Sequence, residues 1–275
     1  MVRPHHSTVY SCTVESFNDD YRLLLEQSGL GKRVADKQRV LIKPNLVEIL
    51  APPITTPVEV VEKIIDYLLE YIPPTAIIIG EGCGASEYDT SHVFAALGYT
   101  DLVEKYGIEL IDLNSAKLRR RTLSSCSRWP EMYLPALLDE VFLLSLPQLK
   151  AHSLAKVTLT MKNMMGCAPP SHYKAGGAWK KAAFHTRLHE AIFELNRYRT
   201  PDYTLLDASV GMAQAHLWGP QCSPPVGRLA ASFDPVAIDS YGTRLLKRRW
   251  QDVDHIVMAD GILGTAMNYD LVDIE

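Results

Sequence analysis

The sequence predicts an α/β protein with a mostly parallel sheet flanked by helices, Rossmann-like in its first half. Short apolar segments of the length of a buried parallel strand recur at 40–42, 76–79 and 141–146. Between the first two, the apolar residues at 60–68 follow the helical period. Successive strand–helix units favour parallel strands joined by right-handed crossovers. We expect a single domain over residues 1–275, while the length also allows two lobes.

The first half of the chain predicts regular elements with identifiable ends. Gly98 is expected to stop one helix, and Thr56 and Pro57 are expected to cap and begin another. In chain order we expect a strand at 7–14, a helix at 17–27, a strand at 39–42, a helix at 57–68, a strand at 76–79, helices at 91–97 and 99–106, and a strand at 108–112.

The second half is expected to alternate in the same way around two irregular segments. The basic stretch within 115–135 predicts an exposed hairpin or excursion, and 167–179, rich in Gly and Pro, predicts either a lid-like loop or a disordered connection. The regular elements expected are a strand at 141–146 stopped by Pro147, a helix at 180–198, a strand at 203–206 ending at Asp207, a strand at 226–232, a helix begun by Asp234 and Pro235, and a closing helix at 253–259.

Composition excludes several classes of protein. The net charge of −4 gives no electrostatic reason to bind nucleic acid, and no apolar run approaches the ~20 residues of a membrane helix. The first residues show no apolar signal core. Five scattered cysteines argue against a disulfide framework and favour a reducing cytoplasm. Because no C-x-x-C occurs, we expect no iron–sulfur cluster in this polypeptide.

Polar candidates cluster where predicted strands end. Lys43 and Asn45 follow the strand at 39–42, and Glu81 follows the strand at 76–79. After the strand at 141–146 come Lys150, His152, Lys162 and Asn163. Parallel strands deliver such residues to one rim of the sheet, where α/β proteins bind ligands. The alternatives are solvated lysines and a surface carboxylate, but the apolar neighbours of Lys162 require it to snorkel, pair or meet a ligand.

Three lysines in an acidic protein suggest an anionic ligand, either a carboxylate or a phosphate. We expect Lys43, Lys150 and Lys162 to converge on one anion site. His152 and Asp207 are candidates for acid–base catalysis, with the Asp fixing the imidazole tautomer. A desolvated Lys as Schiff-base nucleophile is a more speculative alternative.

Three other features carry weaker signals. The glycine cluster at 80–84 lacks the spacing of a dinucleotide loop, so sharp backbone turns explain it better. His185 and His189 have the i, i+4 spacing of metal ligands but no accompanying Glu, so no metal is expected. Asp239 lies in an apolar helical segment that suggests burial, whereas capping explains Asp234.

The segments LKAHSLAKVTLTMKNMMG, LIKPNL and ITTPVEVV resemble motifs of the DUF362 family of unknown function, and the resemblance extends along residues 40–264. The core LKAHSLAKVTLTMKNMMG resembles the family pattern K-x-H…TL-x-x-KN-x-x-G, and LIKPNL with ITTPVEVV resembles its K-P-N…TTP pattern. Gly80 to Gly82, Asp207, and the segment from Ser232 to Asp239 resemble further family motifs. The resemblance also implies a His near His185. Several family members carry an attached iron–sulfur segment, and the closely spaced cysteines of such a segment do not occur in this sequence.

These observations leave two functional hypotheses. The first is an enzyme-like site for a small anionic molecule, with acid–base or redox-linked chemistry and an unknown cofactor. The second, suggested by the resemblance, is a non-catalytic binding or maturation protein for an iron–sulfur or redox partner. A retained small molecule would favour the first, and co-purification with an iron–sulfur protein the second.

Overall fold

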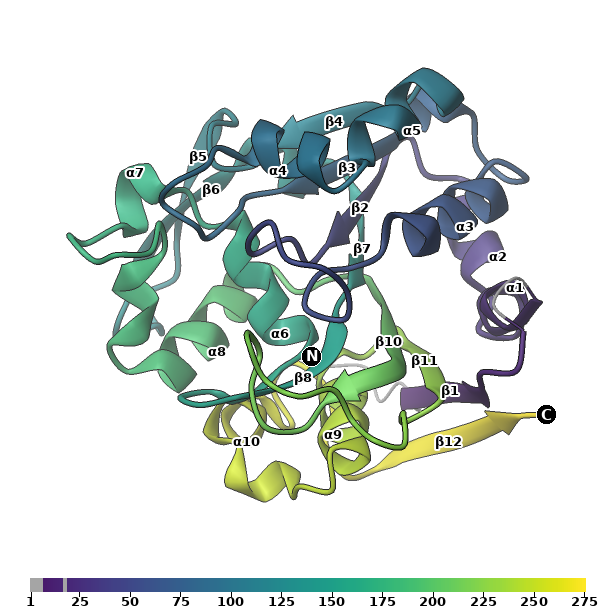
Figure 1. Cartoon of the computed structure of the whole chain (residues 1–275). Helices are drawn as coiled ribbons and strands as arrows, with labels where there is room; N and C mark the ends of the chain where they lie inside the picture. The colour runs from purple at the N-terminus through teal and green to yellow at the C-terminus, as the bar shows by residue number, and fades with distance from the viewer. Residues whose placement is uncertain (1–6, 17–18) are drawn as a thin grey trace.

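The computed structural model describes residues 7–16 and 19–275 (Figure 1). Its strands are β1 (Ser7–Thr13), β2 (Val40–Pro44), β3 (Ile77–Glu81), β4 (Glu109–Asp112), β5 (Leu118–Thr122), β6 (Glu131–Pro135), β7 (Phe142–Leu146), β8 (Gln148–His152), β9 (Lys156–Thr158), β10 (Tyr203–Met212), β11 (Arg228–Ser232) and β12 (Tyr269–Ile274). Its α-helices are α1 (Asp19–Gln27), α2 (Leu30–Val34), α3 (Val58–Leu68), α4 (Thr90–Ala96), α5 (Tyr99–Tyr106), α6 (Thr160–Asn163), α7 (Pro170–Tyr173), α8 (Leu188–Tyr198), α9 (Pro235–Leu245) and α10 (Asp254–Ala259). Short 3-10 turns are η1 (Pro74–Ala76), η2 (Ala136–Asp139), η3 (Met164–Cys167), η4 (Ala182–His185) and η5 (Trp250–Asp252).

One large sheet runs through both halves of the chain. Its order is β12-β1-β11-β10-β7-β2-β3-β4, with β8 joined to β10 and β9 joined to β8. The neighbours from β10 to β4 are parallel, while β11 is antiparallel to β10 and β1. The expected mostly parallel sheet is confirmed, and β2, β3 and β4 with their connecting helices form the Rossmann-like part. Parallel pairing brings the carboxyl ends of β2, β3 and β7 to one rim.

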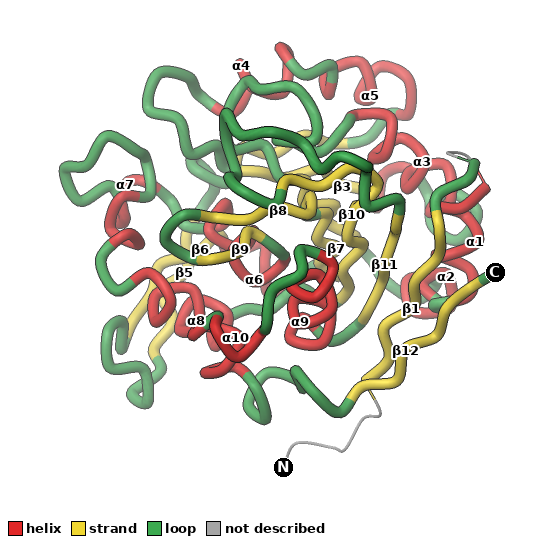
Figure 2. Tube along the Cα trace, turned by 60° about the horizontal axis from the view of Figure 1, so that its bottom comes forward, coloured by secondary structure: helices red, strands yellow, loops and turns green. Residues whose placement is uncertain are grey.

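Helices cover both faces of this sheet, as the two views in Figures 1 and 2 show. The alternation of side chains along a strand explains the two layers. Leu41 of β2 packs in one apolar cluster together with residues of α6, α8, α9 and α10. Val40 and Ile42 pack in the other, with residues of α1 to α5. The α/β architecture is therefore built by strands that are apolar on both sides.

Segment 148–212 departs from the expectation in two ways. Pro147 ends β7, but the chain then forms β8, so Lys150 and His152 lie on a strand and not in a loop. Strand β10 does not end at Asp207 but continues to Met212, and it pairs with β7 first and with β8 further on. The backbone N–H of Asp207 donates to the carbonyl of Pro147, which joins the break between β7 and β8 to β10. Long-range pairing thus extends both strands beyond their apolar runs.

Two expected helices differ in detail. Helix α3 begins at Val58, and Thr56 does not cap it, because its hydroxyl donates to the carbonyl of Leu146 at 2.8 Å. The segment 180–198 is not one helix: η4 and α8 are separated at Arg187, which has a left-handed backbone with φ 48°. The closing strand β12 was not expected, and residues 17–18 of the first expected helix lie outside the described residues.

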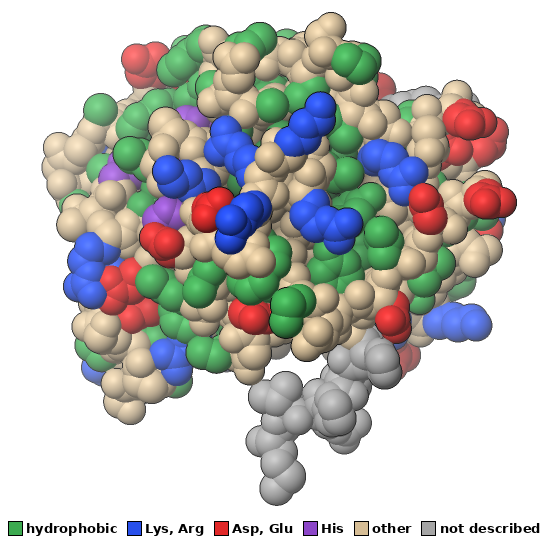
Figure 3. All heavy atoms as spheres, turned by 90° about the horizontal axis from the view of Figure 1, so that it is seen from below, with side chains coloured by type: hydrophobic (Ala, Val, Ile, Leu, Met, Phe, Trp, Pro, Cys, Tyr) green, Lys and Arg blue, Asp and Glu red, His purple; other side chains and the backbone are tan. Residues whose placement is uncertain are grey.

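The two irregular segments have definite structure. Residues 115–135 contain the antiparallel pair β5 and β6, a two-stranded sheet separate from the main one. Residues 167–179 contain the short helix α7. Figure 3 views the molecule from below, where positive side chains gather across the middle of the face among apolar and neutral ones. Within the described residues, no helix combines the length and apolar character needed to cross a membrane.

Candidate functional site

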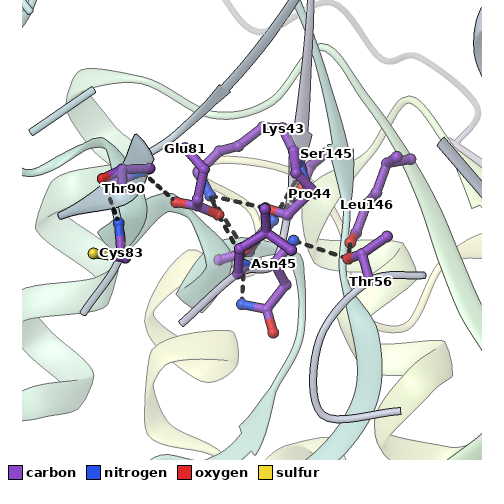
Figure 4. A network of polar contacts seen from close by, with 12 residues as sticks. Lys43, Pro44, Asn45, Thr56, Glu81, Cys83, Thr90, Ser145 and Leu146 are labelled. Atoms are coloured by element: carbon purple, nitrogen blue, oxygen red, sulfur yellow. Dashed lines mark hydrogen bonds and ion pairs between the residues drawn. The ribbon is translucent and has the colours of Figure 1, made fainter. Parts of the chain in front are cut away.

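A buried ion pair lies at the rim where β2 and β3 end (Figure 4). The Lys43 ammonium donates to Glu81 Oε2 at 2.7 Å, and the two residues are only 0% and 2% exposed. Lys43 also donates to Asn163 Oδ1 at 3.2 Å. The second oxygen of Glu81, Oε1, accepts the backbone N–H of Gly82 at 2.8 Å. The charge of Lys43 is therefore neutralised by Glu81 inside the protein. Lys43 stabilises the structure of the site and is not available to bind an anion.

Gly166 allows a loop to close over this ion pair. A methyl group at Gly166 would lie 1.8 Å from Glu81 Oε1 and 2.6 Å from the Lys43 nitrogen. Only a residue without Cβ permits that approach. The buried pair beneath η3 thus explains the glycine at this position.

An amide relay connects the ion pair to Lys150. Asn163 Oδ1 accepts from Asn45 Nδ2 at 3.1 Å, and Asn45 Oδ1 accepts from the Lys150 ammonium at 2.5 Å. The Lys150 ammonium also donates to the carbonyl of Ile54. These acceptors are neutral, so the relay fixes the position of the Lys150 charge without cancelling it. Burial, with a contribution from the charge of Lys162, lowers the pKa of Lys150 to about 7.

A cavity of about 460 Å³ opens above this network. Its size falls in the range of small-molecule sites, ~300–1,000 Å³. Three lysines and three histidines line it, against one carboxylate, Glu81, among the described residues. The polar lining consists of Asn45, Glu81, Lys150, His152, Ser153, Thr158, Lys162, Asn163, Lys181, His185 and His216. Apolar side chains that line it are Val47, Leu154, Met165, Trp179, Leu217 and Trp218. Since Glu81 is paired with Lys43, the cavity presents a net positive charge.

His152 has a defined tautomer. Its Nδ1 accepts the backbone N–H groups of Leu154 and Ala155 at 3.0 and 3.1 Å. Burial and the nearby Lys162 charge hold the pKa of His152 far below its ordinary value, so the ring is neutral and carries its hydrogen on Nε2. The His216 ring stacks on it with centroids 3.9 Å apart, and burial lowers the pKa of His216 to about 3. The pair presents neutral imidazoles to the cavity.

Asp207 is not the partner of this imidazole. Its carboxylate accepts from Gln148 Nε2 at 3.1 Å and from the Ser209 hydroxyl at 2.6 Å. Backbone N–H groups and not a carboxylate orient His152, so the expected His–Asp arrangement is wrong. Asp207 does not line the cavity.

Asp239 is a helix-capping residue from another element. Its two carboxylate oxygens accept the backbone N–H groups of Thr160 and Met161 at 2.8 and 3.0 Å. Burial raises the pKa of Asp239 to about 7. Asp239 therefore positions α6, which carries Lys162 and Asn163, and does not itself line the cavity.

The two histidines of the segment 180–198 point to different surroundings. His185 lines the cavity, where burial and Lys162 lower its pKa. The Nδ1 atom of His189 lies 2.9 Å from the Nδ1 atom of the buried His255. The break at Arg187 explains why the i, i+4 pair does not form a joint site. Within residues 7–16 and 19–275, no group of three or more His, Cys, Asp or Glu side chains is placed to hold a metal.

Sequence reasoning missed Lys181, His216 and two tryptophans of the cavity. The Lys181 ammonium donates to Asn114 Oδ1 and to the carbonyl of Ala168, and burial lowers its pKa to about 8. Trp179 is the last residue of the segment 167–179, and it lines the cavity. Trp218 also lines the cavity, and its side chain is 74% exposed. Trp179, His216 and Trp218 come from Gly- and Pro-rich segments with no apolar period, and Lys181 begins the expected helical segment 180–198, so only the tertiary structure brings these four residues to the cavity.

Fold and site together define an α/β protein with a cation-lined cavity at the carboxyl ends of parallel strands. The pattern of the domain of unknown function DUF362 matches residues 40–244, and the chain belongs to that family. It is 28% identical over 239 residues to the thylakoid-associated protein sll1697 of Synechocystis sp., covering 82% of this chain and 68% of that protein.

The lactate racemase apoprotein of Thermoanaerobacterium thermosaccharolyticum is similar with a TM-score of 0.47 and 17% sequence identity. The match covers 84% of this chain and 55% of the racemase, so the chain spans about half the length of that protein.

Proposed function

We propose that the cavity binds a small carboxylate or phosphate anion and performs acid–base chemistry on it. The observation that carries the proposal is the charge of the lining: Lys150, Lys162 and Lys181 face a cavity whose Glu81 is already paired with Lys43. Burial makes each ammonium costly to keep charged, and a bound anion relieves that cost. The proposal also places the protein in a reducing compartment such as the cytoplasm, since all five cysteines, each within the described residues, are free thiols.

The roles of the lining residues follow from their protonation. Asn45 and the carbonyl of Ile54 hold the Lys150 amine in place, and an anionic oxygen bound to it favours its charged form. His152 offers an Nε2–H donor, as its Nδ1 is engaged by backbone. Burial lowers the pKa of Lys162 to about 8, which puts this amine near the pH at which it exchanges a proton readily. Together they form an anion anchor, a neutral donor and a titrating amine.

Thermal unfolding with phosphate, sulfate and small dicarboxylates tests anion binding. Ligand at a hundred times its dissociation constant should add roughly 2.7 kcal/mol to the stability of the wild type. The Lys150→Met and Lys162→Met variants should lose most of that gain. Lys174→Met, at an exposed lysine outside the lining, is the matched control and should keep it. If all variants respond as the wild type does, the anion site lies elsewhere.

The alternative hypothesis, a binding or maturation protein for a redox partner, makes a different prediction. Such a protein would still bind anions. Amine-reactive labels would modify the cavity lysines of the isolated chain, and binding of the partner would protect these lysines. Turnover of any small anion by the isolated chain would argue against it.

A further inference from the structure

Lys162 differs from the other lysines of the site in having no hydrogen-bond or ion-pair partner among the described residues. Lys43 is paired with Glu81, while Lys150 and Lys181 donate to amide and carbonyl oxygens. Lys162 is only partly buried and lines the cavity from α6, so its ammonium is open to a bound molecule.

Lys162 shares the cavity with the other titrating groups of the lining. Its charge lowers the pKa of Lys150, and it contributes to the lowered pKa values of His152, His185 and His216. All four of these side chains line the same cavity as Lys162. The amine therefore shares the cavity with neutral imidazoles and with Lys150, whose charged form a bound carboxylate favours.

A further polar group of the lining lacks a partner. The buried Oγ1 atom of Thr158 makes no hydrogen bond, although the residue lines the cavity. Buried hydroxyls are almost always hydrogen-bonded. Thr158 ends β9 and Lys162 follows four residues later, so the chain brings an unpaired hydroxyl and an unpaired amine to the same cavity.

We propose that Lys162 forms a Schiff base with the carbonyl carbon of a small oxo acid whose carboxylate binds Lys150. This inference rests on the proposed anion-binding function and names its substrate class. Amines next to a second cation in a desolvated pocket are the lysines that enzymes use for this reaction. At neutral pH a lysine with a pKa of about 8 holds roughly a hundredfold more neutral amine than an exposed lysine.

The reaction balances without any further reagent. The neutral amine adds to the carbonyl carbon, and proton transfer from nitrogen to oxygen gives a carbinolamine. The C–O bond then breaks as the hydroxyl takes a proton and leaves as water, and the nitrogen lone pair forms the C=N bond of the iminium. Water in the cavity takes the proton lost by the Lys162 ammonium and later supplies the proton for the departing hydroxyl, while His152 Nε2–H hydrogen-bonds the reacting oxygen and stays neutral. Net, one ammonium and one carbonyl give one iminium and one water.

Reductive trapping tests this step. The full chain is incubated with pyruvate, acetoacetate or 2-oxoglutarate and sodium cyanoborohydride, and the modified lysine is located by peptide mass spectrometry. We expect one adduct per chain, at Lys162, formed roughly tenfold or more faster than at the exposed Lys174. Lys162→Arg keeps the positive charge and should keep stabilisation by sulfate while losing the adduct. Lys150→Met should slow trapping of all three acids.

The outcomes separate the two proposals. Stabilisation by anions without an adduct from any of the three oxo acids overturns the Schiff base and leaves the anion site standing. Adducts spread evenly over surface lysines, with Lys162→Arg labelled as fast as the wild type, also overturn it. If neither stabilisation nor an adduct occurs, both proposals fail.

Discussion

Replacing Lys43 by Met should destabilise the protein more than it affects ligand affinity directly. The change removes the ammonium that neutralises Glu81 at 2.7 Å, and both residues are buried. Removing one partner of a buried pair leaves an uncompensated charge and costs about 3–5 kcal/mol. The backbone N–H of Gly82 still donates to the carboxylate, which places the expected cost toward the lower end of that range.

Urea denaturation of matched variants measures this cost. Lys43→Met with Glu81→Gln removes both charges and should recover part of the loss, because no unpaired ion remains. Arg39→Met is the control: Arg39 precedes β2 and pairs at 3.1 Å with the exposed Glu109, so its loss should cost under about 1 kcal/mol. A Lys43→Met protein with wild-type stability that has lost all response to sulfate would refute the reasoning and make Lys43 a ligand residue.

Three further changes follow from the same geometry. Gly166→Ala should cost about 1–3 kcal/mol in urea denaturation, since the added methyl overlaps Glu81 Oε1; unchanged stability would contradict the closure of this loop over the ion pair. Burial lowers the pKa of Lys150 to about 7, so the unfolded chain binds more protons than the folded protein between pH 7 and 10.5, and the contribution of Lys150 to the stability of the free protein should rise across that window. Because Lys150 loses its positive charge over the same range, the affinity for sulfate should fall. Calorimetric titration with sulfate at pH 6.5 and 8.5 measures this fall, and equal affinities would contradict it. Trp218→Ala should change the free energy of unfolding by no more than about 0.5 kcal/mol, because the side chain is 74% exposed. The same change should weaken binding of aromatic carboxylates more than binding of acetate, because Trp218 lines the cavity. Equal losses of affinity for both ligands would show that the indole does not contact the ligand.

The parts of the fold that sequence reasoning predicted are those set by local pattern. The apolar runs of β2, β3 and β7 could be recognised, and the parallel arrangement placed Lys43 and Glu81 at one rim, as the structure has them. What their positions could not show was that these two charges cancel each other. Distances between side chains on different strands depend on register and rotamer, which no local pattern encodes.

The rest depended on long-range contacts. Strand β8 exists because β10 continues past Asp207 and offers it a parallel partner, and so His152 lies on a strand with its ring held by the following turn. Asp207 then has nearer partners than His152. Lys181 and His216 lie on segments whose course depends on packing. The cationic character of the site could therefore be predicted from the sequence, but the roles of its individual residues could be predicted only in part.

The central claim is that an anion binds between the cavity lysines, and anomalous diffraction from crystals soaked in selenate would test it most directly. Selenate is a tetrahedral dianion that resembles phosphate, and its selenium can be located without interpretation of weak density. The account predicts a peak inside the cavity, within hydrogen-bond distance of Lys150 and Lys162, that disappears in Lys162→Met crystals. Selenate bound only at surface positions, or a cavity peak that persists in that variant, would contradict it.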